Sequence, residues 1–332
     1  MAGGSRPTMK DVARTARVSL KTVSRVVNGE PTVAPDLAAR VHAAVESLHY
    51  RPHLGASMLR RNDRRTRTIG VLLADLAGPF SAALHRAIAD EASLRDVQVL
   101  AGSTDEDPHR ERELTAAFTQ RHADGLIVAP SGPDQCHLRS LTDIPVVLVD
   151  RPSPGLPADT ILATNTAGAH DAVRHMLARG HRRIAFLGDH DGVATVRDRY
   201  RGYLTALTDA GVPAVEPLGW AEATALALLD GPTPPTAIFT AHHLLTIDAV
   251  RALRLRGLHR RIALVGFDDF PAADLLDPGI TVVAQDPARM GRTAARALLE
   301  RIDGMTGPPR EFWIPTNLIR RGSGEIPPPV AG

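Results

Sequence analysis

The sequence has a single cysteine, few aromatic residues and no long apolar run. Cys136 alone excludes an internal disulfide and a metal site built from several thiolates. Because only 4% of the 332 residues are aromatic, the core must rest on alanine, valine, leucine and isoleucine. No apolar stretch reaches the roughly 18 residues of a membrane span, and the first ten residues lack an apolar export signal. We therefore expect no membrane partner, no cofactor and a cytoplasmic location.

Charge is distributed unevenly along the chain. The net charge of +2 conceals a basic segment, residues 1–67, which holds 13 of the 39 lysines and arginines but only 5 of the 37 acidic residues. This segment carries a net charge of +8, and the remainder carries −6. Such asymmetry indicates a polyanionic partner for the N-terminal segment alone. A solvated basic surface is the ordinary alternative.

The N-terminal segment has the pattern of three short helices. Thr8, followed three residues later by Asp11, predicts the start of the first helix. Ser19 is a good N-cap for the second helix, and the third begins near Pro35. Two helices joined by a tight turn, with a third packed across them, form a helix-turn-helix module, whose second helix can enter the major groove. A small protein-binding bundle would share this pattern, but the charge favours DNA.

The second predicted helix carries an entirely polar stripe, formed by Lys21, Ser24, Arg25 and Asn28. Lys21 and Arg25 are suited to guanine O6 and N7, and Leu20 could contact a thymine methyl group or a sugar edge. Three polar side chains are better placed for phosphates, which position the module without reading sequence: Ser19, Thr22 and Asn28.

Residues 8–59 resemble the headpiece of LacI/GalR-type repressors. The similarity includes KDVA, VS-x-x-TVSRVVN and the closing LHYRP, which contains Tyr50. The resemblance implies that the first, second and sixth residues of the recognition helix read bases, here Leu20, Lys21 and Arg25, and that Tyr50 belongs to the DNA-binding set. Where the family usually has glycine before Val-Ser, this chain has Arg17, which could add a phosphate contact or stiffen the turn.

Residues 52–67 form a linker with five arginines between positions 60 and 67. In the free protein a flexible basic linker is expected, because its Ala-rich part is too short for a stable helix. The resemblance implies instead that a hinge helix forms on operator DNA and inserts Leu59 into the minor groove. Ser57 stands where the family commonly has a basic residue, so hinge affinity is weaker or shifted onto Arg60 and Arg61.

From residue 68 onward, short apolar runs alternate with helical patterns. The predicted strands are 69–73, 97–102, 125–129, 146–149, 184–187, 237–240, 262–266 and 281–284. The predicted helices lie near 80–94, 109–122, 167–179, 197–210, 221–230, 243–257 and 287–302. This alternation indicates parallel sheets covered on both faces, arranged as two doubly wound lobes with a cleft between them. Enzyme motifs such as G-x-x-x-x-G-K-[ST] and G-x-S-x-G are absent from the sequence, which favours sensing over catalysis.

This part resembles a periplasmic-binding-protein type sensor. Its motifs include IGVLLADLAGPF, RGHRRIAFLG and IALVGFDDF. The expected organisation is a helix-turn-helix headpiece over 1–51, a hinge and basic linker over 52–67, and an effector-binding and dimerisation domain over 68–332. Within that domain we expect lobe 1 to comprise about 68–163 plus 286–316, and lobe 2 about 164–285 plus 317–324.

The resemblance also places effector contacts at the ends of strands. The candidates are Phe80, Asp150, Arg151, Thr195, Arg199, Trp220, His242, Asp268 and Gln285. Each has a structural alternative: Trp220 could belong to the core, and Arg199 and Asp268 could pair with each other across the closed cleft. As a convergent set, they favour a binding role.

The chain departs from the family pattern at His242-His243. The family commonly has Asn-Asp at these positions, and that aspartate often binds a sugar hydroxyl. A histidine can donate, accept or carry charge near pH 6.5. This change raises the hypothesis of a phosphorylated or carboxylated effector, bound with pH-dependent affinity.

The sequence thus predicts a regulator of transcription, a repressor by family default, that binds near-palindromic double-stranded operator DNA as a homodimer associated with the nucleoid. A sugar-like effector would control it. Activation instead of repression, and an architectural DNA-binding role without sequence specificity, remain alternatives.

Overall fold

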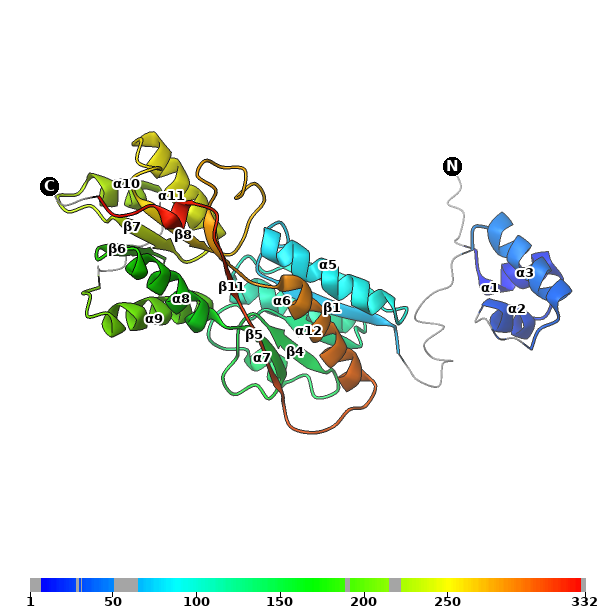
Figure 1. The fold of residues 1–332 in the computed structure, drawn as a ribbon. Coiled ribbons are helices and arrows are strands. Elements are labelled where there is room, and N and C mark those ends of the chain that lie inside the picture. The colour runs from blue at the N-terminus through cyan, green and yellow to red at the C-terminus, as the bar shows by residue number, and fades with distance from the viewer. Residues whose placement is uncertain are drawn as a thin grey trace. The chain divides into compact units, whose positions relative to one another are not determined.

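The computed structural model describes residues 7–27, 30, 32–50, 65–188, 192–214 and 222–329, except the side chains of 222–224. The chain divides into two compact units, Met1–Thr66 and Arg67–Gly332 (Figure 1). No helix within these described ranges is long and apolar enough to cross a membrane.

The N-terminal unit contains three helices: α1 (Met9–Ala16), α2 (Leu20–Val27) and α3 (Pro35–Ser47). The predicted start of α1 is confirmed, because the Thr8 backbone N–H donates to Asp11 Oδ2 at 2.9 Å. Val12, Val23 and Val41 are fully buried and pack together, one from each helix. The helix-turn-helix headpiece predicted from the sequence is therefore confirmed.

Lobe 1 of the larger unit is built on a six-stranded parallel sheet with the order β10-β5-β4-β3-β1-β2. Its strands are β1 (Thr68–Leu73), β2 (Gln98–Ser103), β3 (Gly125–Val128), β4 (Val146–Val149), β5 (Asp159–Ala163) and β10 (Glu311–Ile314). Its helices are α5 (Pro79–Ser93), α6 (Pro108–Gln120), α7 (Cys136–Arg139) and α12 (Pro287–Ile302).

Alternate side chains of these strands enter different cores. Ile69 and Ile127 pack against α5 and α12, whereas Leu72 and Leu126 pack against Phe118 of α6 on the opposite face. Because both faces are buried, the strands are continuous apolar runs, as expected for a parallel sheet with helices on both sides.

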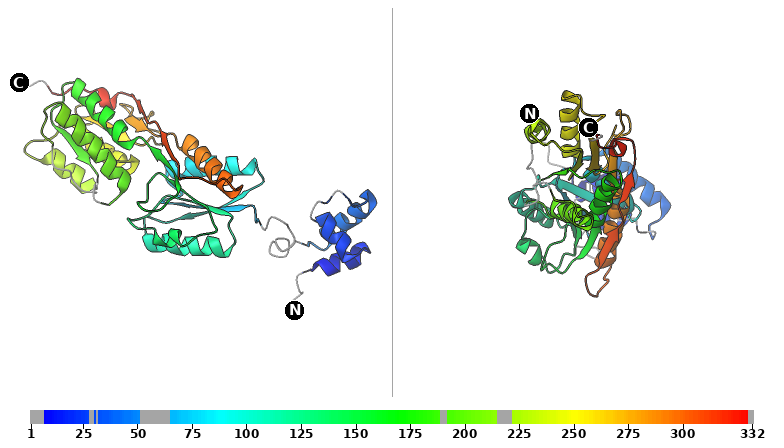
Figure 2. Two further views of the ribbon diagram at one scale, coloured as in Figure 1. Left: turned by 90° about the horizontal axis from the view of Figure 1, so that it is seen from below. Right: turned by 60° about the vertical axis from the view of Figure 1, so that its left-hand side comes forward.

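Lobe 2 has a five-stranded sheet with the order β11-β9-β8-β7-β6, in which only β11 is antiparallel to its neighbour. Its strands are β6 (Ile184–Leu187), β7 (Ala237–Thr240), β8 (Ala263–Phe267), β9 (Thr281–Ala284) and β11 (Asn317–Ile319). Its helices are α8 (Asn165–Ala178), α9 (Ala194–Asp209), α10 (Glu222–Asp230) and α11 (His243–Leu255). Helices α8 and α9 pack side by side (Figures 1 and 2).

The chain passes between the lobes three times. The crossovers lie between β5 and α8, between β9 and α12, and between β10 and β11. The predicted class of two mostly parallel, doubly wound lobes is confirmed. Three strands, β5, β10 and β11, were not predicted.

Candidate DNA and effector sites

The recognition helix α2 begins at a cap that the sequence predicted. The Thr22 backbone N–H donates to Ser19 Oγ at 3.0 Å, and the hydroxyls of Ser19 and Thr22 lie 2.8 Å apart. Val23 and Val26 are buried and fix α2 on the headpiece core. Ser19 and Thr22 thus have a structural role at the helix start in addition to the phosphate contacts expected of them.

The outward face of α2 presents the predicted base-reading side chains. Leu20 and Lys21 are exposed, and Ser24 and Arg25 are half-buried. Arg25 Nε lies 3.5 Å from Glu30 Oε2. This exposed ion pair contributes little to the stability of the fold. Lysine and arginine heads on one accessible face can donate to the acceptor edge of guanine in the major groove.

The remaining predicted DNA contacts have different placements. The Tyr50 side chain is only 7% exposed and packs in the headpiece core, so its position favours a structural role. Asn28, Ser57 and Leu59 lie outside the described residues.

The turn before α2 explains how the chain accommodates Arg17. This residue adopts a left-handed conformation with φ of 53°, which glycine would adopt more easily. The guanidinium of Arg40, on α3, donates to the carbonyls of Ala16 at 2.6 Å and of Arg17 at 3.1 Å. Arg40 therefore ties the third helix to the turn that orients the recognition helix.

Arg199 lies at the centre of a polar cluster in lobe 2. Its Nε donates to Asn165 Oδ1 at 2.9 Å, and its Nη1 donates to Ala241 O at 2.6 Å and to Asp268 Oδ2 at 3.1 Å. The guanidinium carbon lies 3.8 Å from the centre of the Phe267 ring. Because the side chain is 3% exposed, these contacts fix its position before any ligand arrives.

The Arg199–Asp268 pair forms within lobe 2. Arg199 is on α9 and Asp268 directly follows β8, so the expectation that they would pair across the cleft is wrong. Asp268 also accepts from Gln285 Nε2 at 2.7 Å. Gln285 lies on the crossover between β9 and α12, and its Oε1 is a buried acceptor without a hydrogen-bond donor among the described residues.

Lobe 1 presents a matching acidic group. Asp150 directly follows β4, is buried, and has its Oδ2 3.4 Å from Arg151 Nε. Arg151 also pairs with Glu106 and donates to Pro130 O. Burial raises the pKa of Asp150, against the opposing charges of Arg151 and then Arg199, and Asp268 adds to the rise.

Asp150 and Asp268 occupy equivalent positions in the two lobes. Each follows a central strand in a left-handed conformation, with φ of 69° and 71°. Each donates its backbone N–H to the next strand, to Ile161 O and Val283 O respectively, at 2.9 Å. The same backbone conformation thus places one carboxylate directly after a central strand in each lobe, and that of Asp268 lines the cavity described below.

His242 and His243 lie at the start of α11, where His242 is the N-cap. Burial, and secondarily the charge of Arg199, lowers the pKa of His242 to about 4. The pKa of His243 is also lowered, chiefly by burial. His242 is therefore neutral at physiological pH and brings no positive charge to the cleft.

A cavity of about 330 Å³ lies between the lobes and includes three predicted residues. Phe80, on α5, lines it from lobe 1, whereas Asp268 and Gln285 line it from the opposite side. Thr195 is buried in the first turn of α9, and Trp220 lies outside the described residues.

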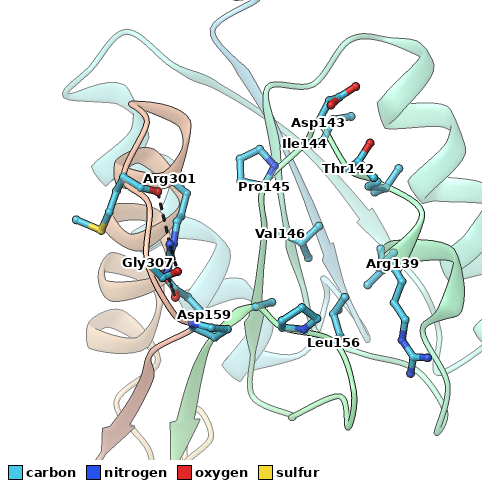
Figure 3. Close-up of a pocket in the computed structure, with 16 residues that line it drawn as sticks. Arg139, Thr142, Asp143, Ile144, Pro145, Val146, Leu156, Asp159, Arg301 and Gly307 are labelled. Carbon is cyan, nitrogen blue, oxygen red and sulfur yellow. Dashed lines mark hydrogen bonds and ion pairs between the residues drawn. The ribbon is translucent and has the colours of Figure 1, made fainter.

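A larger pocket, of about 670 Å³, lies in lobe 1 at the amino ends of β4 and β5 (Figure 3). Asp159 is fully buried on its wall and accepts from Arg301 at 2.6 Å and from Arg310 at 2.7 Å. Burial alone would raise the pKa of Asp159, but these hydrogen bonds outweigh it and hold the pKa at about 2. Ligands of parallel sheets bind at the carboxyl ends of strands, which favours the smaller cavity as the candidate effector site.

Two polar residues of the cleft were missed from the sequence. Asn165, which orients Arg199, follows β5, a strand that was not predicted, and no other local signal pointed to it. Glu106, the partner of Arg151, lies in the loop after β2 among several acidic residues, and only the fold distinguishes it from them.

Comparisons with known proteins agree with both units. Residues 8–53 match the profile of "Bacterial regulatory proteins, lacI family", and residues 173–324 match that of a "Periplasmic binding protein-like domain". The chain is 33% identical to the HTH-type transcriptional regulator PtxS of Pseudomonas plecoglossicida, over 97% of each chain.

Solved structures give the same result. A transcriptional regulator CelR–cellobiose complex is 30% identical, with a TM-score of 0.69, over 96% of this chain and all of that one. The lac repressor dimer bound to operator and the anti-inducer ONPF is 26% identical, with a TM-score of 0.83, over 96% of this chain and 99% of that one. Since the similarity spans both units, the chain belongs to the LacI family of DNA-binding bacterial transcriptional regulators.

Proposed function

We propose that this regulator represses transcription by binding a near-palindromic operator as a homodimer, and that a small effector in the interlobe cleft controls its affinity for that DNA. The observation that carries the proposal is the accessible Lys21–Arg25 face of α2, on a headpiece joined to a sensor with a buried polar cleft. Two headpieces related by a twofold axis match an operator with two half-sites. The similar lac repressor is a dimer bound to operator, which supports this assembly.

Within this proposal, Leu20, Lys21 and Arg25 read bases, whereas Ser19 and Thr22 contact phosphates. The headpiece comprises 1–51 and the hinge 52–67, where Leu59 enters the minor groove. The sensor comprises 68–332, with the chain changing lobes near 163, 285 and 316. This assignment places the protein in the cytoplasm, with the DNA, and gives the cleft a binding role without a catalytic step.

The chemistry of the cleft favours a neutral, hydroxyl-rich effector. Three carboxylates, Asp150, Asp268 and Glu106, face two guanidiniums that already pair with them. The neutral His242 adds no cation, and Gln285 offers a buried acceptor to which none of the described residues donates. Hydroxyl groups can donate to these acceptors, whereas a phosphate or carboxylate would meet an excess of negative charge. His242 and His243 therefore do not favour the anionic effector suggested by the sequence. The cellobiose bound by the similar CelR supports a sugar.

Selection of bound sites from a random DNA pool tests the DNA half of the proposal. A palindromic site is expected, and it should outcompete random duplex by at least ~10³ at physiological salt. Equal competition by random DNA would instead indicate an architectural protein. A reporter gene behind the selected site then distinguishes repression from activation.

Calorimetric titration tests the effector half. Neutral sugars, with cellobiose and ribose as first probes, are compared with sugar phosphates and sugar acids. We expect a neutral sugar to bind and to change operator affinity. Tighter binding of an anionic sugar, abolished in Arg151→Ala, would overturn the assignment of a neutral ligand.

A further inference from the structure

Two of the three crossovers between the lobes run next to each other. Strands β5 and β10 are parallel neighbours in lobe 1, and both leave this lobe at their carboxyl ends. Their pairing continues into the crossover region, where the Thr164 backbone N–H donates to Ile314 O at 3.1 Å. The third crossover, at Gln285 and Asp286, leaves from β9 in the opposite lobe.

Side chains join the two adjacent crossovers. The Thr316 backbone N–H donates to Thr164 Oγ1 at 3.0 Å, and the two hydroxyl oxygens lie 3.2 Å apart. The Thr316 hydroxyl also lies 3.5 Å from the Thr164 carbonyl oxygen, at the limit of a hydrogen bond. Both threonines are half-buried, so water competes less for these bonds than at an exposed site.

A glycine makes room for this contact. A Cβ at Gly168, in the first turn of α8, would lie 2.4 Å from Thr316 Oγ1 and 2.8 Å from a methyl carbon of Val283. The crossover between β10 and β11 can therefore lie close against the start of α8, so that Thr164 and Thr316 meet where the chain enters lobe 2.

The joined crossovers are connected to the effector cluster. Asn165, the residue after Thr164, accepts from Arg199 Nε at 2.9 Å. Hydrogen bonds thus lead from the Arg199–Asp268 pair to Asn165, and from the adjacent Thr164 across to Thr316. A displacement of Arg199 would act on two connections between the lobes at once.

We propose that Thr164 and Thr316 are positioning residues that lock these two crossovers into a single hinge, so that the lobes rotate about one defined axis under the control of the effector cluster. Without the lock, the two crossovers bend independently and the lobes sample more orientations. The inference rests on the proposed function only in that ligand binding is transmitted through lobe rotation. The hinge itself is testable without any ligand.

The test measures the distance between the lobes by pulsed electron spin resonance. One label is placed on the native Cys136, which is exposed in lobe 1, and the other on Ala210→Cys, at the exposed end of α9 in lobe 2. Labelled chains are diluted into an excess of unlabelled chains, so that distances within one chain dominate. Thr164→Val, which keeps the shape but removes the hydroxyl that accepts from the Thr316 backbone N–H, is compared with Thr164→Ser, which keeps the hydroxyl.

Thr164→Val is expected to broaden the interlobe distance distribution, and Thr164→Ser to leave it as in the unmodified protein. Thr205→Val is the matched control, because it removes an exposed threonine hydroxyl that donates to Arg201 O within α9. An unchanged width in Thr164→Val, or an equal broadening in the Thr205→Val control, would overturn the proposal. If Thr164→Val does not fold, Gly168→Ala crowds the Thr316 hydroxyl against the start of α8 and is expected to broaden the distribution.

Adding the selected operator separates this proposal from the proposed function. If operator fails to shift the interlobe distance in the unmodified protein, transmission by lobe rotation is wrong. The hinge would still be supported by broadening in the ligand-free Thr164→Val protein. If operator shifts the distance and Thr164→Val weakens that shift, both are supported.

Discussion

At the scale of single residues, the effector cleft is held ready by contacts among its own charged groups. Arg199 has four neighbours that fix it, namely Asn165, Ala241, Asp268 and Phe267. A ligand meeting such a preorganised cluster orders few side chains on binding, which favours affinity. Because the cleft also contains buried titratable groups, a change of pH can alter its charge and its stability.

His242 makes the sensor sensitive to acid. Its pKa is about 4 in the folded protein and 6.5 ordinarily, so the unfolded chain takes up a proton first. The contribution of His242 to stability is complete above about pH 6.5 and is lost as the pH falls toward 4. Between pH 7 and 5 we expect the unmodified protein to lose about 2 kcal/mol more than His242→Asn.

Urea unfolding of both proteins at several pH values measures this difference. Other histidines titrate in both proteins, so the comparison isolates His242. If the free energy of unfolding changes with pH equally in the two proteins, the His242 imidazole remains solvated in the folded state.

Lys21 is expected to specify one base pair. Lys21→Ala should reduce discrimination at a single position of each half-site by about 1–3 kcal/mol, because a donor to a guanine edge is lost. Lys10→Ala removes the same charge from the exposed surface of α1 and is the control. Binding to a library of single-base operator variants distinguishes them, and a uniform loss with Lys21→Ala would contradict a base-reading role.

The family resemblance named four residues that the structure brings to this region: Phe80, Asp268 and Gln285 line the cavity, and Arg199 pairs with Asp268. The resemblance could not reveal that Arg199 and Asp268 pair within one lobe. This pairing depends on how α9 packs against the end of β8, which is a tertiary relation.

At the scale of secondary-structure elements, the headpiece depends on the turn between α1 and α2. Arg17 holds a left-handed conformation that is unfavourable for a side chain with a Cβ. The turn is stabilised from outside by Arg40, which bonds to two of its carbonyls. This long-range contact compensates for the absent glycine.

Arg40→Ala is expected to destabilise the headpiece by roughly 1–3 kcal/mol, because two carbonyls lose a charged donor. Arg14→Ala is a suitable control, since Arg14 is exposed and forms an ion pair with Asp11 of the same helix. Thermal unfolding of the full chain, followed at the headpiece transition, measures the effect. Equal melting temperatures for the two variants would show that Arg40 contributes nothing to the turn.

All eight strands predicted from apolar runs are present, with bounds that differ by at most one residue at each end. The three missed strands have weaker patterns for physical reasons. Strand β5 follows a proline-rich stretch, and β10 and β11 are short edge strands with exposed side chains such as Trp313. Strands β10 and β11 pair with β5 and β9, which lie well before them in the sequence, so local sequence contains little information about these two strands.

At the scale of the whole molecule, the two units have separate cores. No buried residue is shared between the headpiece cluster around Val23 and the lobe clusters around Ile127 and Phe239. We therefore expect two calorimetric transitions, with the smaller unit melting at the lower temperature, since small cores bury less apolar surface.

Core variants assign these transitions. Val23→Ala should lower the melting temperature of the headpiece transition alone, because the free energy of unfolding of this unit falls by roughly 2 kcal/mol. Ile127→Val should act only on the sensor, whose free energy of unfolding falls by about 1 kcal/mol. A bound effector should raise the sensor transition alone. A single transition that shifts with either variant would instead show that the units unfold as one.

The three crossovers also set the order in which the protein can be made. Lobe 1 draws α12 and β10 from residues 287–314, after almost all of lobe 2 has been translated. A nascent chain therefore carries a finished DNA-binding headpiece while its sensor still lacks one edge of a sheet and a covering helix. During synthesis, the segment that binds DNA precedes the part that regulates it, and the interval ends only when β11, the edge strand of lobe 2, has left the ribosome.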